Sequence, residues 1–319
     1  MKGNAGPAVR GIDKSRLARY IGPFERPAHQ RVAYNEGAMP AAERLIRLAH
    51  SPDADDAFMF CGLATGAVPA DGLAIEHVLE DIETLNQKAR EGAYEVTAIS
   101  IHAYAYVADS YALMTCGASM GDGYGPLVVA RKPMGREELK AATIATPGAW
   151  TSAWLALKLC LGPVETVQVP FDRIGEAVSR GEVDAGVLIH EGQLSYADEG
   201  LVGCLDLGQW WKESTGLPLP LGGNAVRRDV GDDLMRRLAR LVRDSVAWGL
   251  NNRKEALAYA LGYARGLDEA DADRFVGMYV NDYTLDYGDD GREAVRRLLA
   301  DGAQAGLVPE VPLADFVEA

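Results

Sequence analysis

Apolar and polar positions along the chain alternate between a helical and a strand period. Residues 81–92 (DIETLNQKAREG) place apolar side chains on one helix face, with Asp81 where an N-cap is expected and Gly92 where a helix stop is expected. Residues 94–101 (YEVTAISI) then form an apolar run of strand length. Helices and strands go on alternating until residues 232–302, whose pattern is mostly helical. This alternation predicts an α/β fold.

The predicted fold begins with a strand at residues 44–50. A polar turn follows it, and a helix starts at about Asp56. Residues 1–42 are rich in glycine, proline and arginine and lack sustained periodicity. We expect them to form an extension outside the fold, suited to wrap a partner subunit in a homodimer.

A short internal repeat divides the rest of the chain. Residues 88–102 (KAREGAYEVTAISIH) and 177–190 (AVSRGEVDAGVLIH) both contain a helix end, a glycine stop, an acidic residue, an apolar strand and a final histidine. Each copy precedes a glycine-led strand that ends in basic residues, 125–133 and 222–230. Two similar α/β units, each followed by a similar strand, indicate a chain that passes between two lobes twice.

Such a chain is typical of the type II periplasmic-binding-protein-like fold, in which the ligand lies in a cleft between the lobes. The predicted first lobe combines residues 43–135 with residues 225–319, and the predicted second lobe comprises residues 136–224. The fold class predicted is therefore α/β with a ligand cleft.

Composition and charge narrow the function classes. The chain has 319 residues and a formal net charge of −14, which disfavours binding to nucleic acid or to an acidic membrane surface. No apolar run approaches the ~18–20 residues of a membrane span, and the N-terminus lacks the apolar segment of a secretory signal. The four cysteines form no C-x-x-C pair. These features predict a cytoplasmic protein with reduced thiols and a small-molecule partner.

Two histidines end the repeated strands and are therefore placed at comparable points of the cleft. His190 follows the apolar strand of GEVDAGVLIHEG, and an imidazole at a strand's carboxyl end suits proton abstraction at neutral pH. A lone histidine after a strand is more often structural, so both interpretations stay open. Glu191 would point away from His190 and lie either at the rim or behind the residues that contact the ligand. His102 is a weaker candidate for chemistry.

Hydroxyl-bearing residues are expected on the same cleft. TPGAWTSAWLALKLC (146–160) predicts a helix capped by Thr151 or Ser152, whose free N–H groups can bind an anion. Ser51 and Ser100 lie at predicted strand ends, which converge on the cleft in this fold.

The loop SPDADDAF (51–58) carries three aspartates. It lacks the glycine and the distal glutamate of a calcium loop, so no metal site is predicted. Asp55 or Asp56 is expected to cap the next helix, and Asp53 and Asp55 to accept hydrogen bonds from ligand hydroxyls or amines.

No motif for a covalent mechanism or a cofactor is convincing. GASMG (117–121) has the spacing of a serine-hydrolase elbow, but GDGYGP follows it where a helix is required. GDGYGP in turn precedes a strand, not the helix of a dinucleotide site. We therefore expect no cofactor.

Several segments together resemble the 1,4-dihydroxy-6-naphthoate synthase family of the futalosine route to menaquinone. They are DIETLNQKAREGAYEVTAIS, YGPLVVARKP, GEVDAGVLIHEG, DLGQWWKESTGLPLPLGG and YVNDYTLDYGDDGREAV, in order between about Arg44 and Leu307. The resemblance implies a type II binding-protein fold and a cofactor-independent lyase that converts cyclic dehypoxanthinyl futalosine to dihydroxynaphthoate. It also implies that His190 is the base and that Thr151 and Ser152 contact the substrate.

The chain departs from the family pattern around the cleft. SPDADD replaces the typical SPCPND, which puts Asp53 and Asp55 where cysteine and asparagine are expected. Trp150 replaces a histidine, and His102 replaces a small residue. Three hypotheses therefore remain: a naphthoate-synthase-type lyase, a paralogous lyase with another ring-bearing substrate, and a small-molecule binding protein of the same fold.

Overall fold

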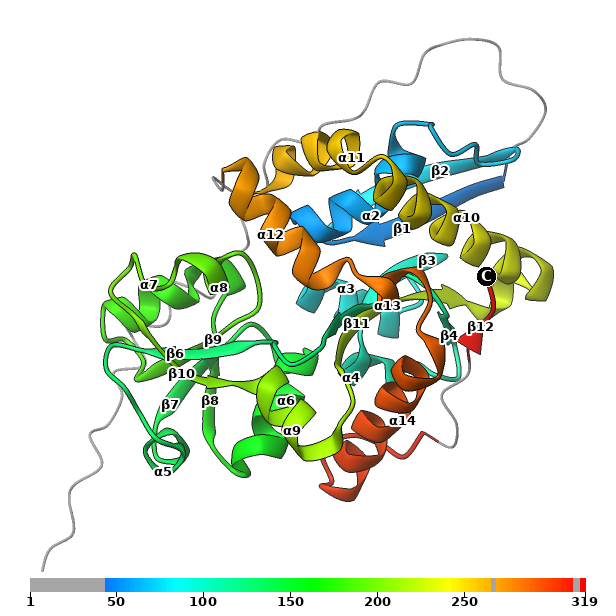
Figure 1. Ribbon diagram of the computed structural model, residues 1–319. Helices are drawn as coiled ribbons and strands as arrows, with labels where there is room; N and C mark the ends of the chain where they lie inside the picture. Colours follow the sequence, from blue (N-terminus) through cyan, green and yellow to red (C-terminus); the bar gives the residue numbers. More distant parts are fainter. Residues whose placement is uncertain (1–43, 265–267, 312–315) are drawn as a thin grey trace, which may run out of the picture. The chain divides into compact units, whose positions relative to one another are not determined.

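The computed structural model describes residues 44–264, 268–311 and 316–319 (Figure 1). The predicted extension, residues 1–42, lies outside these ranges. Within them no helix is both long and apolar enough to cross a membrane.

The strands form two sheets. The first has the order β12-β4-β11-β3-β1-β2, with β5 also paired to β11. Its strands are β1 (Arg44–His50), β2 (Leu73–Leu79), β3 (Val96–Ser100), β4 (Tyr111–Met114), β5 (Ser119–Gly121), β11 (Leu219–Arg227) and β12 (Phe316–Val317). The second has the order β10-β6-β9-β7-β8. Its strands are β6 (Leu127–Ala130), β7 (Thr143–Thr146), β8 (Glu165–Gln168), β9 (Ala185–Leu188) and β10 (Val202–Asp206).

The helices divide into two groups according to the sheet whose strands they connect or follow. Those between strands of the first sheet, or after β11, are α2 (Ala54–Ala64), α3 (Ile82–Arg90), α4 (Ile101–Tyr104), α10 (Asp232–Asn251), α11 (Arg253–Ala260), α12 (Glu269–Tyr279), α13 (Asp282–Leu285) and α14 (Gly288–Gln304). Those between β6 and β11 are α5 (Arg136–Lys140), α6 (Ser152–Leu161), α7 (Ile174–Ser179), α8 (Gly192–Ser195) and α9 (Leu207–Thr215). Short 3₁₀ turns occupy Phe171–Arg173, Arg228–Val230 and Leu261–Tyr263. The α/β class and the helical C-terminal part are confirmed.

The local signals for α3 hold in the structure. The Asp81 side chain accepts a hydrogen bond from the N–H of Thr84 at 3.1 Å, which satisfies one of the helix's unpaired amides. Gly92 has a φ of 66°, a backbone conformation that glycine adopts without a Cβ clash.

Helix α2 begins at Ala54, so the predicted start at Asp56 is two residues late, and neither Asp55 nor Asp56 is its N-cap. The N-cap is Asp53, and Asp56, inside the first turn, accepts the N–H of Ser51 through Oδ2.

The predicted limits of the two lobes need correction. Residues 125–133 were expected in the first lobe, but their strand β6 pairs antiparallel with β9, Leu127 opposite Leu188, in the second sheet. Strand β11 already belongs to the first sheet at Leu219, where it pairs with β5. The chain therefore crosses between sheets after β5 and returns before β11. The two glycine-led strands that look alike in sequence, β6 and β11, therefore belong to different sheets, and their similarity did not predict this difference.

The two sheets share one apolar core. Ile99 and Tyr104, from β3 and α4, belong to the same buried cluster as Val128 of β6 and Leu155 of α6. A second cluster packs α2 and α10 over the first sheet, around residues such as Phe58. Because the first cluster spans both sheets, the start of α6 is held against elements of the first sheet.

Candidate active site

A pocket lies where several chain ends converge. It is lined by residues from the carboxyl ends of β1 and β3, the N-termini of α2 and α6, and strand β11. Six residues predicted for the cleft line it: Ser51, Asp53, Asp55, Ser100, Thr151 and Ser152. Three others, His102, His190 and Glu191, are not among its lining residues. Strand ends and helix starts place ligand-binding groups together here, as they do in open α/β sheets.

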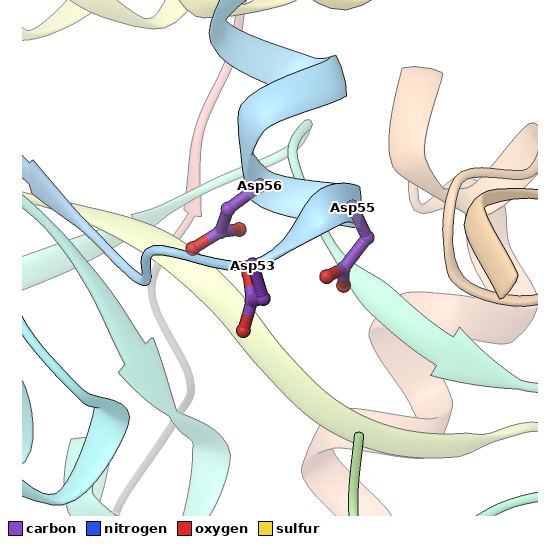
Figure 2. A group of neighbouring side chains, drawn as sticks. All are labelled: Asp53, Asp55 and Asp56. Carbon is purple, nitrogen blue, oxygen red and sulfur yellow. The ribbon is translucent and has the colours of Figure 1, made fainter. Parts of the chain in front are cut away.

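Three aspartates from the first turn of α2 and its N-cap gather on one wall (Figure 2). One carboxylate oxygen from each of Asp53, Asp55 and Asp56 lies within 4.8 Å of the others. Asp56 accepts the N–H of Ser51 at 2.6 Å, whereas Asp53 Oδ1 is buried and has no hydrogen-bond partner among the described residues. No lysine or arginine is among the described residues that line the pocket. This wall therefore offers acceptors to a ligand and no permanent positive charge.

Burial raises the pKa of the Asp53 carboxyl well above its usual range, and the neighbouring charges of Asp55, Asp56 and Glu191 raise that pKa further. Burial also raises the pKa of Asp56 well above its usual value, and that of Asp55 to a lesser degree. Close carboxyls without a cation avoid mutual repulsion by retaining protons. The wall can thus accept hydrogen bonds from hydroxyls, donate one while protonated, or offer oxygen ligands to a hard cation such as Mg²⁺ or Ca²⁺.

Asn224 on β11 adds a polar group that the sequence analysis missed. Its Nδ2 donates to the carbonyl of Gly117 at 3.0 Å, and its Oδ1 is buried with no hydrogen-bond partner in the part of the chain that the structure describes. Asn224 lines the pocket together with Gly117. The only signal in the sequence was an amide residue within an otherwise apolar strand.

The start of α6 forms the opposite wall. Of the two residues predicted to cap this helix, Thr151 is the N-cap. Its Oγ1 accepts from the N–H of Trp154 at 3.2 Å and donates to the carbonyl of Gly148 at 2.9 Å. Ser152 Oγ donates to the carbonyl of Leu221. Both hydroxyl protons are therefore used within the protein. Thr151 Oγ1 takes the first-turn amide of Trp154, so the groups left for a ligand are the amides of Ser152 and Ala153, which have no acceptor inside the helix.

His102 holds this wall from behind. It lies in the single turn of α4, is 2% exposed, and so does not face the cleft as predicted. Its Nδ1 lies 3.1 Å from the carbonyl oxygen of Thr151, and its backbone N–H donates to Ser152 Oγ at 3.2 Å. The ring stacks on Trp154 with centroids 5.4 Å apart, and burial lowers the pKa of His102 to about 4. A neutral imidazole thus anchors α6.

His190 and Glu191 follow β9 at the edge of the pocket. The residue before them, Ile189, lines the pocket, but the half-buried His190 ring packs edge-on against Phe171 with centroids 5.3 Å apart. Its Nδ1 accepts the N–H of Gly192 at 3.3 Å. Glu191 is 4% exposed and does not line the pocket, yet its charge acts on Asp53, so of its two predicted places the one behind the lining residues fits and the open rim does not. The repeat in the sequence therefore does not place His102 and His190 at equivalent points.

Comparisons with known proteins agree with this architecture. A family model described as menaquinone biosynthesis matches residues 46–304. The chain is 43% identical over 272 residues to a protein of Thermus thermophilus named 1,4-dihydroxy-6-naphtoate synthase, covering 85% of this chain and 99% of that protein. A Streptomyces coelicolor protein of the same name is 38% identical over 270 residues, 83% of this chain and 95% of that protein.

Solved structures show the same fold. Protein AF1704 from Archaeoglobus fulgidus aligns with a TM-score of 0.80 and 51% identity, over 83% of this chain and 98% of that one. The alkanesulfonate-binding protein SsuA from Xanthomonas axonopodis pv. citri aligns with a TM-score of 0.65 and 12% identity, over 88% of this chain and 100% of that one. The likeness to SsuA bears on the fold alone. The predicted periplasmic-binding-protein-like fold is confirmed.

Proposed function

Because the chain belongs to the menaquinone biosynthesis family, we propose that it is an enzyme of the 1,4-dihydroxy-6-naphthoate synthase type. Its substrate is cyclic dehypoxanthinyl futalosine or a closely related ring compound, and its reaction is a base-assisted, cofactor-independent elimination that releases a sugar-derived fragment. The observation that carries the proposal is the pocket between β1, β3 and α6 in a chain 43% identical to a synthase over 85% of its length.

The polarity of the pocket supports a substrate that is anionic at one end and hydroxylated at the other. The first-turn amides of α6 carry the partial positive charge of a helix N-terminus and suit a carboxylate. The carboxyls of Asp53 and Asp55 on the other wall suit the hydroxyls of the sugar-derived part. This orientation keeps the substrate carboxylate away from the acidic wall.

The base in this proposal is His190. It directly follows Ile189 of the pocket lining and matches the histidine of the family's IHE segment. Its ring packs against Phe171, so proton abstraction requires the ring to turn towards the pocket once the substrate is bound. Turning also releases Nδ1 from the N–H of Gly192, so that its lone pair can take the proton. The electrons of the broken C–H bond form a carbon–carbon double bond, and the leaving fragment departs with the electrons of the bond that held it.

A second candidate function is a lyase with a different ring-bearing substrate. Asp53 and Asp55 favour it, because they add acidic groups where the family pattern has cysteine and asparagine. A binding protein without catalysis is supported by the fold alone, as represented by SsuA. The two lyase functions differ only in substrate, so they are distinguished by the compound that the enzyme consumes.

The test is turnover of cyclic dehypoxanthinyl futalosine by the purified protein, with the naphthoate product measured by chromatography. The His190→Ala variant should lower kcat by about 10²- to 10⁴-fold with little change in substrate affinity, as expected for loss of a positioned base. Asp198→Asn, an exposed change in the same segment, is the control and should keep the parental rate. Parental turnover by a folded His190→Ala variant refutes the base. Loss of affinity alone, with kcat unchanged, makes His190 a ligand contact and also refutes the base, whereas a parent that binds the compound without turnover favours the binding-protein function.

A further inference from the structure

A buried amide lies behind the pocket, on the helix that precedes β3. Asn86 of α3 is fully buried and does not line the pocket. Its Oδ1 accepts from the N–H of Ser100 at 2.9 Å, and its Nδ2 donates to Ser100 Oγ at 3.0 Å and to the carbonyl of Trp150 at 3.3 Å. The amide thus joins the end of β3 to the residue that precedes the cap of α6.

These bonds fix the direction of the Ser100 hydroxyl. Ser100 Oγ receives a hydrogen from Asn86, so its own hydrogen must point elsewhere. The contacts of the described residues provide no acceptor for that hydrogen, and Ser100 lines the pocket. The hydroxyl is therefore presented to a ligand as a donor.

A second residue of α3 strengthens the connection to α6. Glu83 is also buried, and its Oε2 accepts the N–H of Trp150 at 3.2 Å. The backbone of Trp150 is thus held on both sides, at N–H by Glu83 and at the carbonyl by Asn86. Trp150 directly precedes Thr151, whose position sets the first-turn amides of α6.

We propose that Asn86 is a positioning residue: it holds Ser100 as a hydrogen-bond donor to an oxygen of the substrate and keeps that donor in register with the start of α6. The inference rests on the proposed function for the identity of the substrate. In this proposal the Ser100 hydroxyl and the α6 amides bind the same anionic group of the substrate, because both offer hydrogen-bond donors from neighbouring parts of the pocket.

The first variant is Asn86→Asp, which keeps the shape of the side chain and its acceptor for the N–H of Ser100. The assay is run at pH 8 or above, because burial beside Glu83 raises the pKa of the new carboxyl. Once ionised, this carboxylate cannot donate, so the Ser100 hydroxyl turns its hydrogen towards it and no longer serves the substrate. Loss of one hydrogen bond to a charged group should raise KM by about 10- to 100-fold. The kcat should change by less than about threefold, since Asn86 touches no reacting atom. Glu91→Gln, an exposed charge change at the end of the same helix, is the control.

A double-mutant cycle separates positioning from general damage to the fold. Ser100→Ala alone should raise KM by a similar factor, and adding Asn86→Asp to it should cause a clearly smaller further loss than Asn86→Asp causes in the parent, because most of the amide's effect acts through the hydroxyl and only the bond to the Trp150 carbonyl acts beside it. Independent, additive losses overturn the proposal. So does a Ser100→Ala enzyme with the parental KM, a result that remains informative even where Asn86→Asp does not fold.

Calorimetric affinity for 1,4-dihydroxy-6-naphthoate, measured on the same variants, distinguishes this inference from the proposed function. A parent that neither turns over the futalosine compound nor binds the naphthoate refutes the proposed function, and with it the inference. An active parent whose KM and naphthoate affinity are unchanged by Asn86→Asp refutes the inference alone.

Discussion

Replacement of Glu83 by glutamine should change how the stability of the protein depends on pH. The Glu83 carboxylate is buried between α3 and the loop before α6, and it accepts hydrogen bonds from the N–H of Trp150 and from Gln87 Nε2. Burial raises its pKa from the usual 4.5 to about 6, against the opposing effect of these bonds. Glu83→Gln keeps an acceptor for the N–H of Trp150 and removes the titration.

The direction in which the free energy of unfolding changes with pH follows from the raised pKa of Glu83. Between pH 4.5 and about 6 the unfolded chain releases the Glu83 proton while the folded chain keeps it. The free energy of unfolding therefore falls as pH rises through this window. A pKa of about 6 in place of 4.5 corresponds to at most about 2 kcal/mol, and partial solvation of the carboxylate reduces this figure. The full contribution is present below pH 4.5 and is lost above about pH 6.

The assay is urea denaturation of the parent and Glu83→Gln at pH values from 4 to 8. Glu83→Gln can differ from the parent by a constant offset, because its extra N–H donors are buried. The informative quantity is the change of the difference with pH: the variant should gain on the parent by about 1–2 kcal/mol between pH 4 and pH 7, and by little above pH 7. A difference that stays flat across the range refutes the buried, perturbed carboxylate. Glu91→Gln should give that flat difference, as the exposed control.

Two further substitutions test the walls of the pocket. A Cβ at Gly148 would overlap Oε2 and Cδ of Glu83, so Gly148→Ala should lower the free energy of unfolding by about 1–3 kcal/mol in chemical denaturation. At Gly135 the nearest atom would lie 3.8 Å from the Cβ, so Gly135→Ala should have a much smaller effect. Asp53→Asn should stabilise the protein relative to the parent at pH 8 more than at pH 4, because burial and neighbouring carboxyls raise the pKa of Asp53 in the folded state. Equal effects at the two pH values, measured by the same denaturation, contradict that account.

Local patterns in the sequence predicted the parts of the site that depend on local structure. Asp81 and Gly92 mark the ends of α3, and Thr151 marks the start of α6, because capping is settled by a few neighbouring residues. The lining residues Ser51 and Ser100 followed from a rule about strand ends. These inferences needed no knowledge of which segments meet in space.

The residues that sequence reasoning misplaced depend on tertiary contacts. His102 follows a strand as His190 does, yet the chain turns at once into α4 and buries the ring against Trp154. Strand β6 resembles β11 in sequence, but it pairs with β9 and therefore belongs to the second sheet. Asn86 did carry a signal, since it lies beside Leu85 on the apolar face of α3, where a polar residue must find partners.

The contacts around α6 indicate why this pocket can tolerate an acidic wall. Asn86 and Glu83 of α3, His102 of α4 and the Leu221 carbonyl of β11 all bind the segment from Trp150 to Ser152. Because Ser152 donates its hydroxyl proton to the carbonyl of Leu221 and Thr151 donates its own to the carbonyl of Gly148, the α6 wall presents mainly amide donors. The α2 wall presents mainly carboxyl acceptors. Under the proposed function, a substrate with a carboxylate and hydroxyls places its carboxylate at the α6 wall and its hydroxyls at the α2 wall, so we expect exchanges on the acidic wall to alter selectivity for the sugar-derived group more than affinity for the carboxylate.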